Sequence, residues 1–84
     1  MYTVYVLYSK KFNKIYIGYT SDLDTRIISH NELSQKGWTR RYRPWEIVFT
    51  EEFEIKWDTI KREKQLKSYQ GRKFIWDLIE NRNT

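Results

Sequence analysis

The sequence contains no cysteine, a single proline and three glycines among its 84 residues. Without cysteine, the chain can form no disulfide, no thiolate nucleophile and no zinc site built on cysteine. Three scattered glycines make no glycine-rich phosphate loop, so nucleotide cofactors are not indicated. No apolar run approaches the roughly 18 residues of a membrane span, and Met1–Val4 does not have the pattern of a secretory signal. We therefore expect a soluble, cytoplasmic protein without a membrane-bound part.

Aromatic residues make up 18% of the chain and hydrophobic residues 39%. A chain of this length suffices for one compact domain and is too short for two. Large aromatic side chains bury much apolar surface per residue, which offsets part of the conformational entropy lost on folding. We expect a single domain over residues 1–84.

The net charge is +5 and the isoelectric point is about 9.5, a balance that favours polyanionic partners such as nucleic acids. Since many small basic proteins bind no nucleic acid, the positions of the cations matter more than their number. Three arginines fall in an aromatic segment, where we expect Trp38, Tyr42 and Trp45 to serve packing rather than base stacking. The expected phosphate contacts are Arg40, Arg41 and Arg43 in that segment, and Lys61 and Lys67 further on.

Three segments have the patterns of β-strands. Tyr2–Tyr8 is apolar on both faces, which is typical of a central strand. Lys14–Tyr19 alternates, and turn residues between the two segments predict an antiparallel hairpin that brings Tyr5 near Tyr16. Trp45–Phe53 alternates well enough for a third strand.

Helical patterns occupy the remaining segments. Ser21 or Asp22 offers a capping oxygen for a helix that extends to about Leu33. A second helix begins near Ile55 and is broken at Gly71, and a third ends the chain. The order strand, strand, helix, strand, helix, helix predicts an α+β fold with a small, three-stranded, largely antiparallel sheet flanked by helices.

Charged residues on the first helix recur at a helical spacing. Asp22, Arg26 and His30 lie four residues apart, so Arg26 and His30 project from one face. An exposed polar face is the simpler explanation for either residue taken alone.

Glu63 interrupts the apolar stripe of the second helix, which Trp57, Ile60 and Leu66 form. A buried carboxylate costs several kcal/mol unless it meets a metal ion, a cation or hydrogen-bond donors. Lys67 lies four residues further on and is a candidate ion-pair partner.

Five short motifs occur one after another along the chain. Ten residues separate the last residue of Thr3-Val4-Tyr5 from the first of Tyr16-Ile17-Gly18, and Asp22-Leu23 with Arg26 follow. Arg43-Pro44-Trp45-Glu46 and Lys61-Arg62-Glu63-Lys64-Gln65-Leu66-Lys67 come next. Together these motifs resemble the GIY-YIG nuclease superfamily, in particular its small stand-alone bacterial members. Thr3 stands where that family has glycine, and Tyr19 where some relatives have lysine.

The resemblance implies a catalytic centre. Arg26 would bind the scissile phosphate, and His30 stands where relatives have histidine or tyrosine. Gly18 would let the substrate backbone approach closely. Which tyrosine helps to activate water stays open. The implied catalytic set is Tyr5, Tyr16, Arg26, His30 and Glu63.

The resemblance also implies a metal ion, held by Glu63. Mg²⁺, or Mn²⁺ in its place, prefers oxygen ligands and keeps waters, so one carboxylate and substrate phosphate oxygens can suffice. The other acids form no obvious second cluster, which favours one ion that polarises the phosphate.

We therefore expect a divalent-metal-dependent endonuclease that acts on DNA, with RNA as an open alternative and DNA repair or recombination as a setting. No residues are left for a base-reading domain, so substrate structure or a protein partner would direct cleavage. Two alternatives remain. A catalytically inactive nucleic-acid-binding module would keep salt-sensitive binding, whereas a protein-interaction adaptor would keep a partner at high salt.

Overall fold

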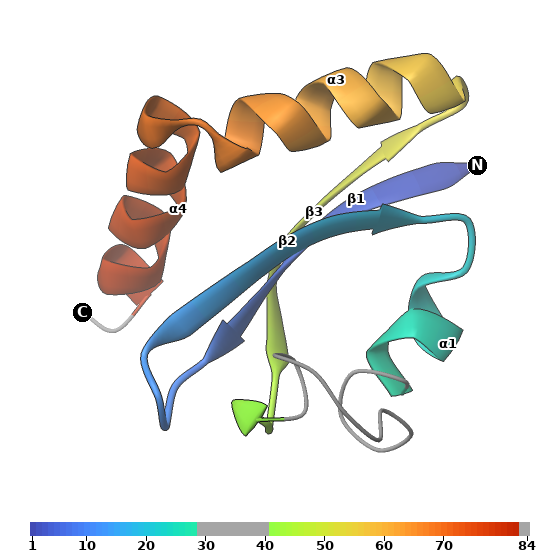
Figure 1. The fold of residues 1–84 in the computed structure, drawn as a ribbon. Helices are drawn as coiled ribbons and strands as arrows, with labels where there is room; N and C mark the ends of the chain where they lie inside the picture. The colour runs from blue at the N-terminus through green and yellow to red at the C-terminus, as the bar shows by residue number, and fades with distance from the viewer. Residues whose placement is uncertain (29–40, 83–84) are drawn as a thin grey trace.

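The computed structural model describes residues 1–28 and 41–82. Within these residues the elements occur in the predicted order of two strands, a helix, a strand and two helices (Figure 1). Their bounds are β1 Tyr2–Ser9, β2 Lys14–Thr20, α1 Leu23–Ile28, β3 Glu46–Phe53, α3 Lys56–Lys67 and α4 Tyr69–Arg82.

The sheet has the strand order β2-β1-β3, and both strand pairs are antiparallel. The prediction that the first strand is central is therefore confirmed, as is the hairpin that it forms with the second. In the β1–β2 register Tyr5 lies opposite Gly18, and Leu7 lies opposite Tyr16. Because side chains alternate along a strand, these four residues share one face of the sheet.

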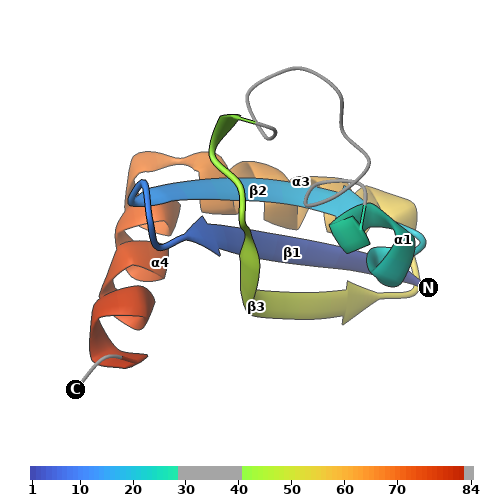
Figure 2. The ribbon, with the colours of Figure 1, turned by 90° about the horizontal axis from the view of Figure 1, so that it is seen from below.

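Apolar residues cover both faces of the sheet. α3 lies over one face, and α1 lies on the other side, near the end of β2 (Figures 1 and 2). On the α1 face, Tyr5, Leu7 and Trp45 form a buried cluster. On the α3 face the main core consists of Val4, Val6, Ile15, Ile17, Leu66, Ile75 and Ile79.

Asp22 caps the N-terminus of α1, as predicted. Its Oδ1 accepts a hydrogen bond from the Thr25 backbone N–H at 3.2 Å, and its Oδ2 accepts one from the Thr25 hydroxyl at 2.8 Å. Such a cap satisfies a donor that the first helical turn leaves free. The predicted continuation towards Leu33 lies outside the described residues.

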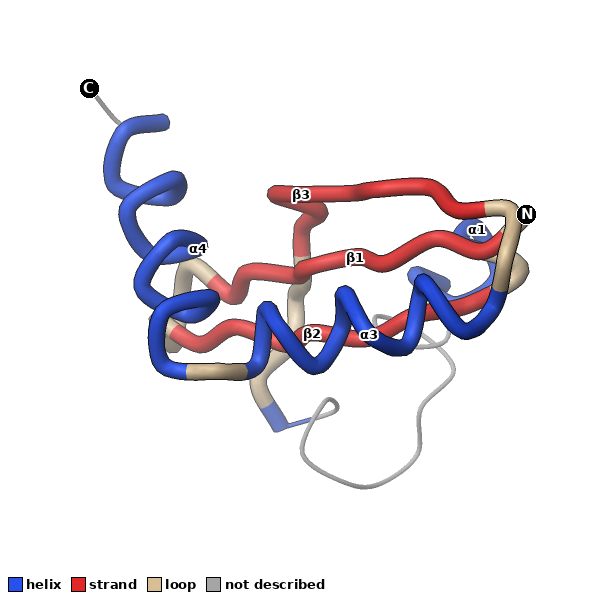
Figure 3. The backbone as a smooth tube through the Cα atoms, turned by 90° about the horizontal axis from the view of Figure 1, so that it is seen from above, coloured by secondary structure: helices blue, strands red, loops and turns tan. Residues whose placement is uncertain are grey.

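The break between the last two helices falls at Ser68, so the prediction that Gly71 breaks the helix is wrong. Ser68 Oγ donates to the Gln65 carbonyl at 2.6 Å and accepts from the Gly71 N–H at 3.2 Å, which caps α4. Gly71 lies inside the first turn of α4, where a Cβ atom would collide with the Gln65 carbonyl oxygen. Glycine is required there because the two helices meet closely at the corner (Figure 3).

An ion pair links α3 to β3. Arg62 Nε donates to Glu51 Oε1 at 2.8 Å.

Thr59 and Leu66 are the buried residues of α3, whereas Trp57 is 62% exposed. The predicted place of Trp57 in the apolar stripe is therefore wrong. Thr59 can be buried instead, because its hydroxyl donates to the Ile55 carbonyl at 3.0 Å.

None of the helices in residues 1–28 and 41–82 is long and apolar enough to cross a membrane.

Candidate active site

An open hollow of about 280 Å³ lies at the β2 edge of the sheet, between this strand and α3. Four residues that we predicted to be catalytic meet there from four different elements: Tyr5 from β1, Tyr16 from β2, Arg26 from α1 and Glu63 from α3. Lys67 and Gly18, which we predicted to contact nucleic acid, also line it. The full lining is Tyr5, Tyr16, Ile17, Gly18, Tyr19, Arg26, Glu63 and Lys67.

Because position 18 carries no side chain, Tyr5 of the central strand can extend to the β2 edge of the sheet. A Cβ atom at position 18 would lie 2.7 Å from the Tyr5 hydroxyl oxygen and 3.1 Å from Tyr16 Cε1. Real Cβ atoms do not approach other atoms as closely as the first of these distances. The Tyr5 phenol therefore fills the space of the missing side chain, which explains the glycine by packing within the protein. Close approach of a substrate backbone at Gly18 stays a prediction.

The two motif tyrosines lie near each other, as we predicted from the hairpin, and their rings stack. Their ring centroids are 6.2 Å apart with an interplanar angle of 25°. Trp45 is 4% exposed, and its ring meets that of Tyr16 edge-on at 6.3 Å, so its predicted packing role is confirmed. Tyr5 is fully buried, whereas Tyr16 is only half-buried. Water can therefore reach Tyr16 more easily than Tyr5.

The environment of Tyr5 disfavours ionisation of its phenol. Burial raises the pKa of Tyr5 from the usual 10.0 to about 12. A hydrogen bond with Arg26 and the charge of Arg26 oppose this rise, while Tyr16 and Glu63 add to it. Any tyrosine is un-ionised at neutral pH, and the raised pKa extends the range in which Tyr5 keeps its proton to strongly alkaline solution.

Arg26 brings a cation to the hollow from the exposed face of α1. Its backbone N–H donates to the Asp22 carbonyl at 3.2 Å, so the first turn of α1, which Asp22 caps, holds the backbone of Arg26 in place. A guanidinium presents five donors in a planar fork that matches the oxygens of a phosphate. The geometry suits a tetrahedral anion placed over the two tyrosines.

Glu63 faces the hollow together with a cation from its own helix. Lys67 Nζ lies 3.2 Å from Glu63 Oε1, and the Glu63 side chain is 16% exposed. The ion pair that we considered from the spacing is therefore present, and it explains how an acid is tolerated beside the core.

The residues around Glu63 fit a hard divalent cation that keeps most of its waters. Among residues 1–28 and 41–82, no three aspartate, glutamate, histidine or cysteine side chains gather closely enough to hold a metal ion. Mg²⁺ needs no such cage, because one carboxylate and phosphate oxygens can hold it. Glu63 is the carboxylate that lines the hollow, so it is the candidate ligand.

Some of the predicted site residues do not line this hollow. Lys61 is two residues before Glu63, about 200° around α3, and points away from it. Arg41 lies with its guanidinium carbon 5.5 Å from the centre of the Tyr42 ring. Arg43 is also absent from the lining. His30, Arg40 and Trp38 lie outside the described residues.

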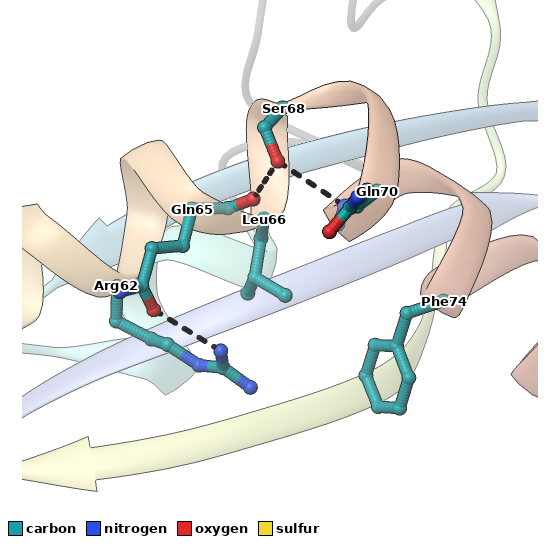
Figure 4. Close-up of a pocket in the computed structure, with 7 residues that line it drawn as sticks. Arg62, Gln65, Leu66, Ser68, Gln70 and Phe74 are labelled. Atoms are coloured by element: carbon teal, nitrogen blue, oxygen red, sulfur yellow. Dashed lines mark hydrogen bonds between the residues drawn. The ribbon is translucent and has the colours of Figure 1, made fainter.

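A larger hollow of about 500 Å³ lies at the corner of α3 and α4 (Figure 4). Apolar Leu66 and Phe74 contribute to its walls, and Arg62 donates to the Gln65 side chain at 3.2 Å. Arg62 is also paired with Glu51. None of the predicted catalytic residues lines this hollow, and it lacks a carboxylate. The smaller hollow at the β2 edge is therefore the better candidate site.

Comparisons with known proteins support the same assignment. Residues 1–74 match the GIY-YIG catalytic domain family. A UPF0213 protein of Staphylococcus saprophyticus is 35% identical over 63 residues, covering 75% of this chain and 77% of the relative. The UPF0213 protein YazA of Bacillus subtilis is 34% identical over 74 residues, covering 88% of this chain and 75% of the relative. A solution NMR structure of a UPF0213 protein from Bacillus halodurans matches with a TM-score of 0.55 and 31% identity, covering 93% of this chain and 85% of that one.

Proposed function

We propose, from the premise that this chain belongs to the GIY-YIG catalytic domain family, that it is a divalent-metal-dependent endonuclease that hydrolyses phosphodiester bonds in DNA. Members of the family are generally endonucleases that use a divalent metal ion. One observation carries the proposal: Tyr5, Tyr16, Arg26 and Glu63 come from four elements and line one open hollow. Residues 1–84 would act as a single nuclease domain.

Arg26 would bind the scissile phosphate. In hydrolysis, water adds to phosphorus, the bond from phosphorus to the leaving oxygen breaks, and a proton ends on that oxygen. Negative charge grows on the phosphate oxygens during the addition, and a guanidinium that is already in place stabilises it. The proximity of Arg26 to Tyr5 gives the phosphate a second donor, since Tyr5 is protonated.

The two tyrosines would have different roles. Tyr5 is buried and has a pKa raised to about 12, so it suits hydrogen-bond donation to a phosphate oxygen. Tyr16 is accessible from the hollow and suits orientation of the attacking water, whose hydrogen bond its hydroxyl oxygen accepts. Of the two tyrosines, we therefore assign the contact with water to Tyr16.

Glu63 would hold one Mg²⁺ or Mn²⁺ ion through its carboxylate, together with phosphate oxygens of the substrate. When bound, the ion supplies Lewis-acid polarisation of the phosphate and stabilises the charge on the leaving oxygen. Lys67, whose Nζ lies 3.2 Å from Glu63 Oε1, would hold the carboxylate at the wall of the hollow in the absence of the ion. Substrate structure or a protein partner would select the cleavage point, because phosphate contacts by themselves carry no sequence information.

The test is cutting of DNA by wild type, Glu63→Gln and Glu54→Gln. Glu54 is exposed and lies outside the hollow, so its substitution is a matched loss of one carboxylate. Each protein is incubated with Mg²⁺ or Mn²⁺ and supercoiled, single-stranded, flapped and branched DNA, with RNA as a comparison. We expect cutting by wild type and Glu54→Gln and none by Glu63→Gln.

Two other results would count against the proposal. If no variant cuts but all bind DNA with equal salt sensitivity, the domain is a binding module. Equal cutting by all three proteins would mean a contaminating nuclease or a wrong assignment of Glu63.

A further inference from the structure

A second hollow of about 330 Å³ continues from the candidate active site along β2. It shares Tyr16, Ile17 and Lys67 with the catalytic hollow, and adds Ile15 and Arg72. Because they share these three residues, the two hollows form one groove along the edge strand β2. Figure 3 shows the elements that border it: β2, α3 and the beginning of α4.

The groove has a row of cations and few acids. Arg26 contributes to its first part, Lys67 to both parts and Arg72 to the second. Glu63, the proposed metal ligand, is the acid of the first part, and the second part contains none. A groove lined by cations that tracks a strand edge fits a phosphate backbone.

Nothing in the described structure uses the charge of Arg72. Its backbone N–H donates to the Ser68 carbonyl at 2.9 Å, as the first turn of α4 requires. Its side chain is exposed, and within residues 1–28 and 41–82 the ion pairs involve other cations, Arg62 and Lys67. Arg72 is therefore available to a ligand in the groove.

The spacing fits neighbouring phosphates of one strand. The first hollow is lined by residues 16–19 of β2, the second by residues 15–17. The two linings are thus offset by one to two residues along β2, roughly 5 Å at the usual strand rise. An offset of this size is on the order of the spacing between neighbouring phosphates, since one strand of a duplex carries a phosphate per roughly 3.4 Å of helix axis.

Tyr69 adds an aromatic ring on the same side of α4. It lies three residues before Arg72, a spacing that places two side chains on one helix face. It is 84% exposed, and packing therefore does not account for it. Exposed aromatic rings beside cations serve as stacking platforms for bases in single-stranded nucleic acid.

We propose that the groove along β2 binds the DNA strand on one side of the cleavage point, with Arg72 contacting a phosphate next to the scissile one and Tyr69 stacking on a base. This inference deepens the proposed nuclease function and rests on it for the identity of the strand. The sequence motifs did not indicate Arg72. The corner at Ser68 places it beside the groove: on a continuous helix without this break, Arg72 would lie about 140° around the axis from Lys67.

The test measures DNA binding without cutting. A fluorescent single-stranded DNA of about 12 nucleotides, within the usual range of single-strand sites, is titrated with protein in a metal chelator over a series of salt concentrations. Wild type is compared with Arg72→Gln, Arg72→Lys, Tyr69→Ala and Arg82→Gln. Arg82 is exposed at the far end of the same helix and outside the groove, so its substitution is a matched loss of charge.

We expect Arg72→Gln to weaken binding about tenfold in roughly 20 mM salt and to reduce the slope of log affinity against log salt by about 0.7, the value for one phosphate contact to a single strand. Arg72→Lys should keep the slope, because it keeps the charge. Arg82→Gln should match wild type. Tyr69→Ala should weaken binding at every salt concentration with the slope unchanged, since stacking releases no counterions.

Equal binding and equal slopes for Arg72→Gln and Arg82→Gln would overturn the proposal. The nuclease proposal fails separately, in the cutting assay, and a loss of slope in Arg72→Gln would still establish the groove as a binding surface if no variant cut DNA.

Discussion

The phenol of Tyr5 occupies the space that a side chain at position 18 would fill, with its hydroxyl oxygen 2.7 Å from where a Cβ atom would stand. Tyr5 belongs to the central strand, and Gly18 lies opposite it on the edge strand. The missing side chain is what allows a residue of the central strand to reach the hollow at the sheet edge. Packing therefore couples Tyr5 of the first motif to Gly18 of the second.

Gly18→Ala should destabilise the protein by about 1–3 kcal/mol, because the new methyl group overpacks against a buried ring. Denaturant unfolding measures the difference. The double variant Tyr5→Leu, Gly18→Ala should be less destabilised than the sum of the two single variants, since the smaller side chain leaves room for the methyl group. Strictly additive losses would show that the contact between residues 5 and 18 is not the cause.

Arg26→Lys should lower the rate of DNA cutting by about a hundredfold to a thousandfold, equivalent to roughly 2.7–4 kcal/mol, as for loss of one donor to a developing oxyanion. A lysine keeps the charge and loses the planar fork. Stability should change little, because the side chain is exposed. The measurement is single-turnover cutting with saturating protein. A rate within threefold of wild type would remove Arg26 from the phosphate site.

Lys67→Met should strengthen binding of Mn²⁺ in the absence of DNA by about two- to fivefold, the range of a partly exposed ion pair. The substitution removes the cation that competes for the Glu63 carboxylate and repels a metal ion. Calorimetric titration with Mn²⁺ checks this, and Glu63→Gln should bind none at this site. Weaker Mn²⁺ binding by Lys67→Met would mean that Lys67 orients the carboxylate rather than competing for it.

The raised pKa of Tyr5 predicts a loss of stability in alkali. Above pH 10 the unfolded chain loses the Tyr5 proton while the folded chain keeps it until about pH 12, so the free energy of unfolding falls by about 1.4 kcal/mol per pH unit in that interval. Tyr5→Phe removes this contribution. In metal-free buffer its stability should decline less steeply than that of wild type between pH 9 and 11, and parallel declines would contradict the burial of an un-ionised phenol.

The strands and the α+β order could be predicted because they depend on local pattern. Val4 to Leu7 are apolar on both faces and form the central strand. The candidate site could be assembled largely from its motifs, since Tyr5, Tyr16, Arg26 and Glu63 do meet. The outer phosphate contacts could not, because Lys61 and Lys67 have the same charge but project about 120° apart around one helix, and only Lys67 lines the hollow.

The sequence by itself determined the alternation that buries Val4, Val6, Ile15 and Ile17, the aspartate cap of α1 and the spacing of the tyrosine motifs, because each depends on neighbouring residues. Only the tertiary structure decided where the last two helices separate, since Ser68 and Gly71 act through the close approach of α4 to the end of α3. It also decided that the pKa of Tyr5 would rise to about 12 and that Arg72 would line the groove. Burial and proximity across elements are properties of the packed chain, and no local pattern contains them.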